Sequence, residues 1–264
     1  KCGVVLQGCS ADDDSSGNTD PCADVVCGEG EICAGGACIP DPNDTRTVFD
    51  TSTFVKECND VDETYTIVRI TDRGEGIGSV KLVNNIVYIL NSRVFVNDGQ
   101  TLEIEEGTII KGASGQGEDA KALIVARGGT IQAEGTADDP IIFTSESDDI
   151  FRNENGYCEG DQTGSLSATT RGLWGGVIIL GSASLNTVPG EQQIEGIPTS
   201  EARGVYGGSE DGDNSGVFKY VSIRYGGTDI GAGNEINGLT MGGVGNGTTI
   251  EYVEVFGNKD DGFE

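Results

Sequence analysis

The chain contains 264 residues, of which 44 are acidic and 16 basic, so its formal net charge is −28; it has 43 glycines, eight cysteines and no histidine. The acidic excess repels nucleic acid and anionic membrane surfaces and makes divalent cations natural partners, although acidity can also serve only to keep a secreted protein soluble. The absence of histidine excludes serine–histidine and cysteine–histidine catalysis.

Residues 1–19 are predicted to be a signal-like segment followed by a polar tether. The stretch Leu6–Cys9 is similar to the end of a bacterial lipoprotein signal, in which the cysteine is acylated. A lipid on Cys9 would bind the protein to a membrane surface without a spanning helix. A disulfide between Cys2 and Cys9 is the alternative.

Residues 20–45 are predicted to form a small cysteine-rich module and a linker. The four cysteines of the module are Cys22, Cys27, Cys33 and Cys38. They could bind zinc or form two disulfides, but zinc knuckles usually use Cys-x2-Cys pairs and these gaps are wider. The order of the spacings is similar to that of EGF-like modules in secreted bacterial surface proteins, which favours disulfides. Their connectivity stays open, and Cys22–Cys33 with Cys27–Cys38 is a guess.

Residues 46–264 are predicted to form the main domain, because a short β-rich pattern repeats along them. The stretch Val94–Thr108 recurs as Leu123–Thr136 at an offset of 28 or 29 residues, with glycine at the corners. Within each copy, apolar residues alternate with polar ones, which is typical of short strands that bury one face. Strands this short need a neighbour one turn later that pairs with them in parallel.

The repeat therefore predicts an all-β fold, a right-handed parallel β-helix with a small N-terminal disulfide-rich segment. A β-sandwich also has many short strands, but it would not require similar stretches at a near-constant offset. The decisive expectation is that Val94 and Leu123 are neighbours in adjacent coils. Thr47–Ile89 is expected to cover the open edge of the first coil. The apolar residues expected to do so are Phe49, Phe54, Val55, Tyr65, Ile67, Val68 and Ile70.

Residues 146–172 are predicted to be a long polar insertion between coils, where solenoids often carry binding surfaces. Cys58 and Cys158 are the two cysteines left over, and both lie in irregular polar stretches. A disulfide between them would join the cover of the first coil to this later loop.

Several glycine-framed stretches resemble a family of secreted parallel β-helix surface proteins, pectate-lyase-like in fold, from Gram-negative marine and Bacteroidota-type bacteria. These stretches are Leu102–Lys111, Leu123–Ser145, Trp174–Ser184, Tyr220–Gly227 and Leu239–Glu264. The resemblance implies the fold and a location outside the cell or at the outer membrane surface, often as a lipoprotein. It implies no catalytic residues. It also implies that further coils follow Asp260–Glu264, or that the last coil stacks on a partner.

Acidic glycine-rich loops are the candidate metal sites. Ser209–Ser215 places several oxygen ligands within one turn, which suits calcium. The candidate ligands there are Glu210, Asp211, Asp213 and Asn214. Asp260 and Asp261 lie one coil later and could align beside them. The loop lacks the full EF-hand spacing, so a solvated turn is the alternative.

The function predicted first is that of a non-enzymatic extracellular protein, in which a rigid acidic β-helix serves adhesion, glycan contact or assembly at the cell surface. The rival is a calcium-dependent polysaccharide lyase or another glycan-active enzyme, with Arg224 as an outward base; a solvated arginine is the alternative. A third is a subunit of an extracellular filament that associates end to end. Expected partners are polysaccharides or another surface protein, without nucleic acid and without membrane contact except through a lipid on Cys9.

Overall fold

The computed structural model describes residues 22–23, 25–27, 31–34, 37–41, 44–158, 162–231 and 234–264. The chain divides into two compact units after Asp44. Cys2 and Cys9 lie outside the described residues, so the lipid on Cys9 stays a prediction. In the described part of the chain, no helix is long and apolar enough to cross a membrane.

The small unit contains an antiparallel hairpin of β1 (Glu31–Ala34) and β2 (Ala37–Pro40). Disulfides join Cys22 to Cys33 and Cys27 to Cys38, which is the pairing guessed from the sequence. Each disulfide ties one strand of the hairpin to the segment that precedes it. A unit this small buries little apolar surface, and covalent cross-links compensate for that.

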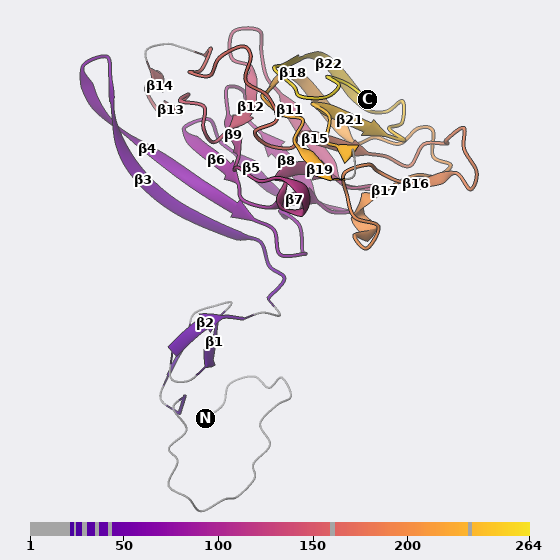
Figure 1. Cartoon of the computed structure of the whole chain (residues 1–264), viewed down its shortest axis with the longest axis horizontal. Helices are drawn as coiled ribbons and strands as arrows, with labels where there is room; N and C mark the ends of the chain where they lie inside the picture. The colour runs from indigo at the N-terminus through magenta and orange to yellow at the C-terminus, as the bar shows by residue number, and fades with distance from the viewer. Residues whose placement is uncertain are drawn as a thin grey trace, which may run out of the picture. The chain divides into compact units, whose positions relative to one another are not determined.

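The larger unit consists mainly of short parallel strands stacked in three ladders (Figure 1). The first ladder contains β5 (Val80–Leu82), β8 (Thr101–Ile104), β11 (Thr130–Glu134) and the first halves of β18 (Gly216–Arg224) and β22 (Thr249–Phe256). The second contains β6 (Ile86–Leu90), β9 (Ile109–Gly112), β12 (Ile141–Ser145) and the second halves of β18 and β22. The third contains β7 (Arg93–Val96), β10 (Ala122–Val125), β15 (Val177–Leu180) and β21 (Leu239–Gly242).

Corresponding residues of successive coils lie directly over one another. In the third ladder, one column of paired residues runs through Val94, Leu123, Val177 and Leu239. The expectation that Val94 and Leu123 are neighbours in adjacent coils is therefore confirmed. The all-β, right-handed parallel β-helix with an N-terminal disulfide-rich segment is confirmed with it.

The inward side chains of the ladders form one continuous core, in which Leu123, Val177 and Phe143 are almost completely buried. Trp174 fills the corner before β15, and its Nε1 donates a hydrogen bond to the carbonyl of Arg224 at 2.8 Å. A Cβ atom on Gly112 would lie 2.6 Å from Trp174. Gly112 therefore makes room for the indole ring of Trp174, and the hydrogen bond to Arg224 satisfies the buried indole N–H.

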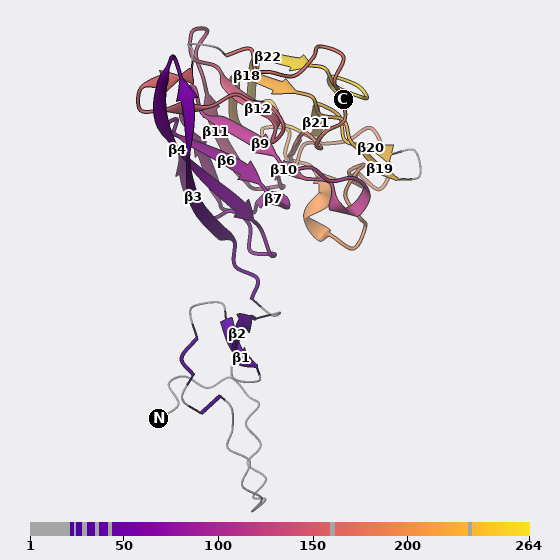
Figure 2. The ribbon, with the colours of Figure 1, turned by 60° about the vertical axis from the view of Figure 1, so that its left-hand side comes forward.

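The edge hairpin, formed by β3 (Val48–Cys58) and β4 (Val61–Thr71), precedes the first coil (Figures 1 and 2). Strand β4 pairs in parallel with β6, so it extends the second ladder. Tyr65 and Ile70 on β4 are 0% exposed, as expected for residues that cover the first coil. Phe49 and Val55 do not cover it, because β3 forms the outer edge of the sheet and leaves them 42% and 62% exposed.

Insertions carry the remaining short elements. These are η1 (Gly117–Asp119), β13 (Arg152–Asn153), β14 (Gly156–Tyr157), β16 (Glu191–Gln193), η3 (Ala202–Gly204), β17 (Val205–Gly207), β19 (Asp229–Gly231) and β20 (Asn234–Glu235). The first insertion (residues 146–176) packs Ile150 and Phe151 against the outer face of the second ladder. The second insertion (residues 181–215) packs Ile194 and Ile197 against the outer face of the third. Two outer faces of the coil are thus covered by apolar side chains.

Lys111, on β9, is buried beneath the first insertion with only 1% of its surface exposed. Its Nζ donates a hydrogen bond to the carbonyl of Asp148 at 2.6 Å and lies 3.8 Å from the centre of the Phe151 ring. Burial lowers the pKa of Lys111 from 10.5 to about 8, because the charged form loses its hydration, although nearby carboxylates oppose the shift.

We expect this lysine to make the protein more stable as the pH rises. Between the lowered folded pKa and the ordinary unfolded one, the unfolded chain binds a proton that the folded chain does not. From about pH 7 to about pH 9.5, the free energy of unfolding should gain about 2 kcal/mol from Lys111. Denaturant unfolding at both pH values would measure this gain, which Lys111→Met should lack. Equal pH dependence in the two proteins would contradict the expectation.

Candidate functional site

A polar cavity of about 300 Å³ lies on the outer side of the third ladder, between the first coil and the second insertion. We call it the Arg203 pocket. Its basic side chains are Arg93, Lys121 and Arg203, and its acidic side chains are Asp72, Glu118, Asp119 and Glu201. The pocket therefore brings three cations among four carboxylates, so its lining is mixed in charge although the protein as a whole is strongly negative.

Asp72, in the loop after β4, organises the wall of the pocket. Its side chain is 1% exposed. Oδ1 accepts hydrogen bonds from the backbone of Gly74 at 2.7 Å and Gly76 at 3.0 Å, and Oδ2 accepts one from the backbone of Phe95 at 3.1 Å. The Nη1 atom of Arg203 donates to the same Oδ2 at 3.0 Å. The buried carboxylate is thus both neutralised and hydrogen-bonded, as a buried charge requires.

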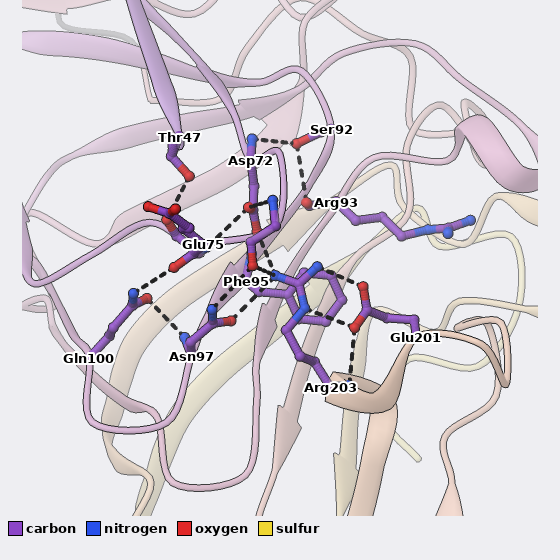
Figure 3. A network of polar contacts seen from close by, with 12 residues as sticks. Thr47, Asp72, Glu75, Ser92, Arg93, Phe95, Asn97, Gln100, Glu201 and Arg203 are labelled. Atoms are coloured by element: carbon purple, nitrogen blue, oxygen red, sulfur yellow. Dashed lines mark hydrogen bonds and ion pairs between the residues drawn. The ribbon is translucent and has the colours of Figure 1, made fainter. Parts of the chain in front are cut away.

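Arg203 comes from the second insertion and lies at the centre of these contacts (Figure 3). Its Nε and Nη2 donate to the carboxylate of Glu201 at 2.8 and 2.6 Å. Its Nη1 also donates to the carbonyl of Gly74 at 3.1 Å and to Oδ1 of Asn97 at 3.3 Å. The guanidinium lies 3.8 Å from the centre of the Phe95 ring. Arg203 therefore fastens the second insertion to the first coil by hydrogen bonds, charge and stacking.

Arg93 is the basic group of the pocket that retains hydrogen-bonding capacity. Its Nη2 donates to the carbonyl of Gly117 at 3.4 Å, and its Nε has no hydrogen-bond partner within the described ranges. Burial lowers the pKa of Arg93, while Glu118 and Glu201 oppose this shift. Lys121, by contrast, is engaged with the carboxylate of Asp119. Arg93 is therefore the least engaged of the three cations, although its Nε is itself buried and out of reach of a ligand.

The Glu201 carboxylate suits hydrogen bonding better than proton transfer. The hydrogen bond from Arg203 lowers the pKa of Glu201, although burial opposes it. A carboxylate with a lowered pKa accepts hydrogen bonds well but is a poor general acid near neutral pH. Glycoside hydrolysis needs one carboxyl group whose pKa is raised. Glu201 therefore does not suit that acid role.

Side-chain oxygen atoms of the predicted calcium loop accept hydrogen bonds from within the protein. Oδ1 of Asp211 accepts a hydrogen bond from the backbone of Ser184 at 3.0 Å, which lowers the pKa of Asp211, and Oδ2 of Asp213 accepts one from Ser215 at 3.3 Å. Exposure separates the four candidates: Asp213 is half-buried, whereas Glu210, Asp211 and Asn214 are exposed. Across the described residues, no three acidic or cysteine side chains are positioned to hold a metal ion. The calcium site in this loop stays a prediction.

Asp260 and Asp261 lie at a different corner of the coil from the calcium loop. In the next coil, the residue that lies against the calcium loop is Asn246, whose backbone N–H donates a hydrogen bond to the carbonyl of Asp211 at 2.9 Å. The backbone of the residue just before the two aspartates instead donates to the carbonyl of Gly226 at 3.0 Å. The expectation that the two acidic loops align is wrong, because one precedes β18 whereas the other follows β22.

Arg224, the candidate base of a lyase, is half-buried and engaged in hydrogen bonds within the protein. Its Nε donates to Oγ of Ser222 at 2.9 Å and its Nη1 to the carbonyl of Gln162 at 2.6 Å. Ser222 in turn donates to Oε2 of Glu254 at 2.7 Å. Arg224 therefore holds the first insertion against the second ladder.

Cys58 and Cys158 lie beside each other although they are far apart in the sequence. Sγ of Cys158 is 3.9 Å from the carbonyl oxygen of Glu57, and the side chain of Cys158 contacts those of Cys58 and Tyr65. Both are thiols in the structure. The disulfide between them stays a prediction.

The sequence analysis missed the Arg203 pocket altogether. The available signal was local: Glu201 and Arg203, two residues apart in a polar stretch, can pair with each other. No feature of that stretch predicts that Arg203 also pairs with Asp72.

A family model described as a pectate-lyase like beta helix domain matches residues 74–156 and 162–264, which are more than two thirds of the chain. No curated protein and no solved structure matches the chain. The matched residues include the coils and, except for Asp72, the side chains that form the Arg203 pocket.

Proposed function

The chain belongs to the family of pectate-lyase-like β-helix domains, and from this premise we propose that it is a non-enzymatic extracellular protein that contacts glycans at the cell surface through the Arg203 pocket. The observation that carries the proposal is Arg93, a half-buried cation that lines the pocket beside acidic acceptors and makes one long hydrogen bond, 3.4 Å, to the carbonyl of Gly117. The stacked coils supply a rigid support, so little conformational freedom is lost on binding.

Sugar hydroxyl groups both donate and accept hydrogen bonds, and they suit a lining in which donors and acceptors alternate. Arg93 offers donors, and the neighbouring Glu118 and Glu201 offer acceptors. The face of Phe95 is already covered by Arg203. Recognition would therefore depend on hydrogen bonds and charge more than on stacking of a sugar ring on Phe95.

Arg93→Ala is expected to weaken retention in gels that contain a bound polysaccharide by about tenfold, the equivalent of about 1.4 kcal/mol. Affinity electrophoresis with a panel of neutral and acidic polysaccharides would measure the retention. Lys81→Ala is the matched control, because Lys81 is an exposed cation on the first ladder, away from the pocket. If both variants were retained like the unmodified protein, the pocket would not be the glycan contact.

The alternative is a calcium-dependent polysaccharide lyase or another glycan-active enzyme, with which membership of a pectate-lyase-like family is equally compatible. The test is incubation with acidic polysaccharides, with and without calcium. New unsaturated ends released only with calcium would establish the lyase and overturn the non-enzymatic proposal. Reducing ends formed in either condition would indicate a hydrolase instead.

End-to-end association into a filament is the second alternative. Ile250, Val253 and Val255 on β22 pack against the core but are only partly buried, so a further layer would cover them. Electron micrographs that show only single particles would count against a filament.

The proposed location at the cell surface includes a lipid on Cys9 that holds the protein to the membrane. Mass spectrometry of membrane-extracted protein would test for that lipid.

A further inference from the structure

The tip of the edge hairpin and the first insertion meet at two cysteines. Cys58 is the last residue of β3 and is 3% exposed, whereas Cys158 follows β14 and is half-buried. The Cys158 thiol reaches the carbonyl of Glu57, the neighbour of Cys58, at 3.9 Å. The two thiols also contact each other and the Tyr65 hydroxyl. Residues separated by 100 positions therefore present their sulfur atoms to one another.

Other contacts hold the two segments in this position. The Phe151 ring centre lies 4.9 Å from that of Phe54 and 5.6 Å from that of Tyr65. Nζ of Lys56 lies 2.5 Å from Oδ2 of Asp149. On the other strand of the hairpin, Oε2 of Glu63 accepts a hydrogen bond from the first insertion at 2.6 Å. Because these contacts do not involve sulfur, they keep the thiols together before any bond forms.

We propose that Cys58 and Cys158 form a disulfide that fastens the edge hairpin to the first insertion. A small-molecule or protein disulfide is the oxidant. The thiolate of Cys158 attacks it and displaces one of its sulfurs as a thiolate. The thiolate of Cys58 then attacks Sγ of Cys158 and displaces the second sulfur. The protein dithiol loses two protons and two electrons, and the donor disulfide becomes two thiols.

Two further features fit this reaction. A cavity of about 190 Å³ reaches Cys158 between Lys56 and Phe151, so a small disulfide can approach that sulfur. The Cys22–Cys33 and Cys27–Cys38 disulfides belong to the same chain, and they require a compartment in which thiols are oxidised. Burial raises the pKa of the Cys158 thiol, so oxidation should be faster at alkaline pH.

The experiment compares the full chain after reduction with the full chain after incubation with oxidised glutathione. One portion of each sample is unfolded in excess alkylating agent, so that buried thiols are also blocked, and is then digested and analysed by mass spectrometry; the thermal unfolding of the other portion is recorded. We expect a peptide pair linked through Cys58 and Cys158 in the oxidised sample only. We also expect the main unfolding transition to rise by about 10 °C, because the bond closes a long loop.

The double variant Cys58→Ser/Cys158→Ser separates this bond from the two N-terminal disulfides, which it retains. Its main transition should not respond to oxidation. Should the variant fail to fold, the linked peptide and the thermal shift of the unmodified chain decide the matter without it. The proposal is overturned if both thiols remain alkylatable after prolonged oxidation at alkaline pH, or if Cys58 and Cys158 appear only in mixed disulfides with glutathione.

Discussion

Arg203→Ala is expected to lower the free energy of unfolding by about 3 to 5 kcal/mol, as removal of one partner from a buried ion pair typically does. Arg203 is the cation that neutralises the Asp72 carboxylate, which is 1% exposed. Its loss would leave that charge buried, and it would also remove the contacts to Glu201 and the Phe95 ring. Denaturant unfolding near neutral pH would measure the change.

Two variants separate this ion pair from a general effect of charge. Lys81→Ala removes a cation whose pair with Glu105 is exposed, and it should change the free energy of unfolding by less than about 1 kcal/mol. Arg203→Lys keeps the charge but removes the planar guanidinium that donates two hydrogen bonds to the carboxylate of Glu201. An intermediate loss of unfolding free energy is therefore expected. A loss no larger for Arg203→Ala than for Lys81→Ala would show that Arg203 does not hold the second insertion.

Gly216→Ala is expected to destabilise the protein by at least about 3 kcal/mol, because it combines a strained backbone with a clash. Gly216 begins β18 at a φ of +107°, and a Cβ atom there would lie 1.9 Å from the carbonyl oxygen of Ile131. That carbonyl cannot easily retreat, since the backbone of Ile131 is also hydrogen-bonded to Ser215 at 2.9 Å. The substitution would separate two adjacent coils.

Gly212→Ala is the matched control for this substitution, four residues earlier in the second insertion. No atom lies within 4 Å of a Cβ atom built at Gly212, and its φ lies outside the left-handed range. Its effect should stay within about 0.5 kcal/mol. Thermal unfolding of both variants would compare them. Similar melting temperatures would mean that the β11–β18 register tolerates a side chain at Gly216.

The corner residues show which backbone conformations the sequence predicts and which it does not. Five glycines of the repeat are expected at corners: Gly99, Gly107 and Gly128 adopt positive φ, whereas Gly129 and Gly135 do not. Tyr220 and Tyr252 also adopt positive φ, at 49° and 53°, although neither residue type favours it. Their rings stack with centres 4.5 Å apart in successive coils. The stacking and the ladder together hold these tyrosines in place, and no property of either residue alone predicts it.

The amino-acid sequence by itself determined the coil, the inward faces of its strands and the vertical pairing of Val94 with Leu123. Alternating apolar residues at a near-constant offset can share one core only by stacking in parallel, so local pattern and global fold agree. Only the tertiary structure decided the Arg203 pocket. Arg203 and Asp72 are 131 positions apart, and they meet because an insertion of irregular sequence folds back on the first coil. Insertions do not follow the repeat of the coils, so the sequence does not indicate which coil their side chains will contact.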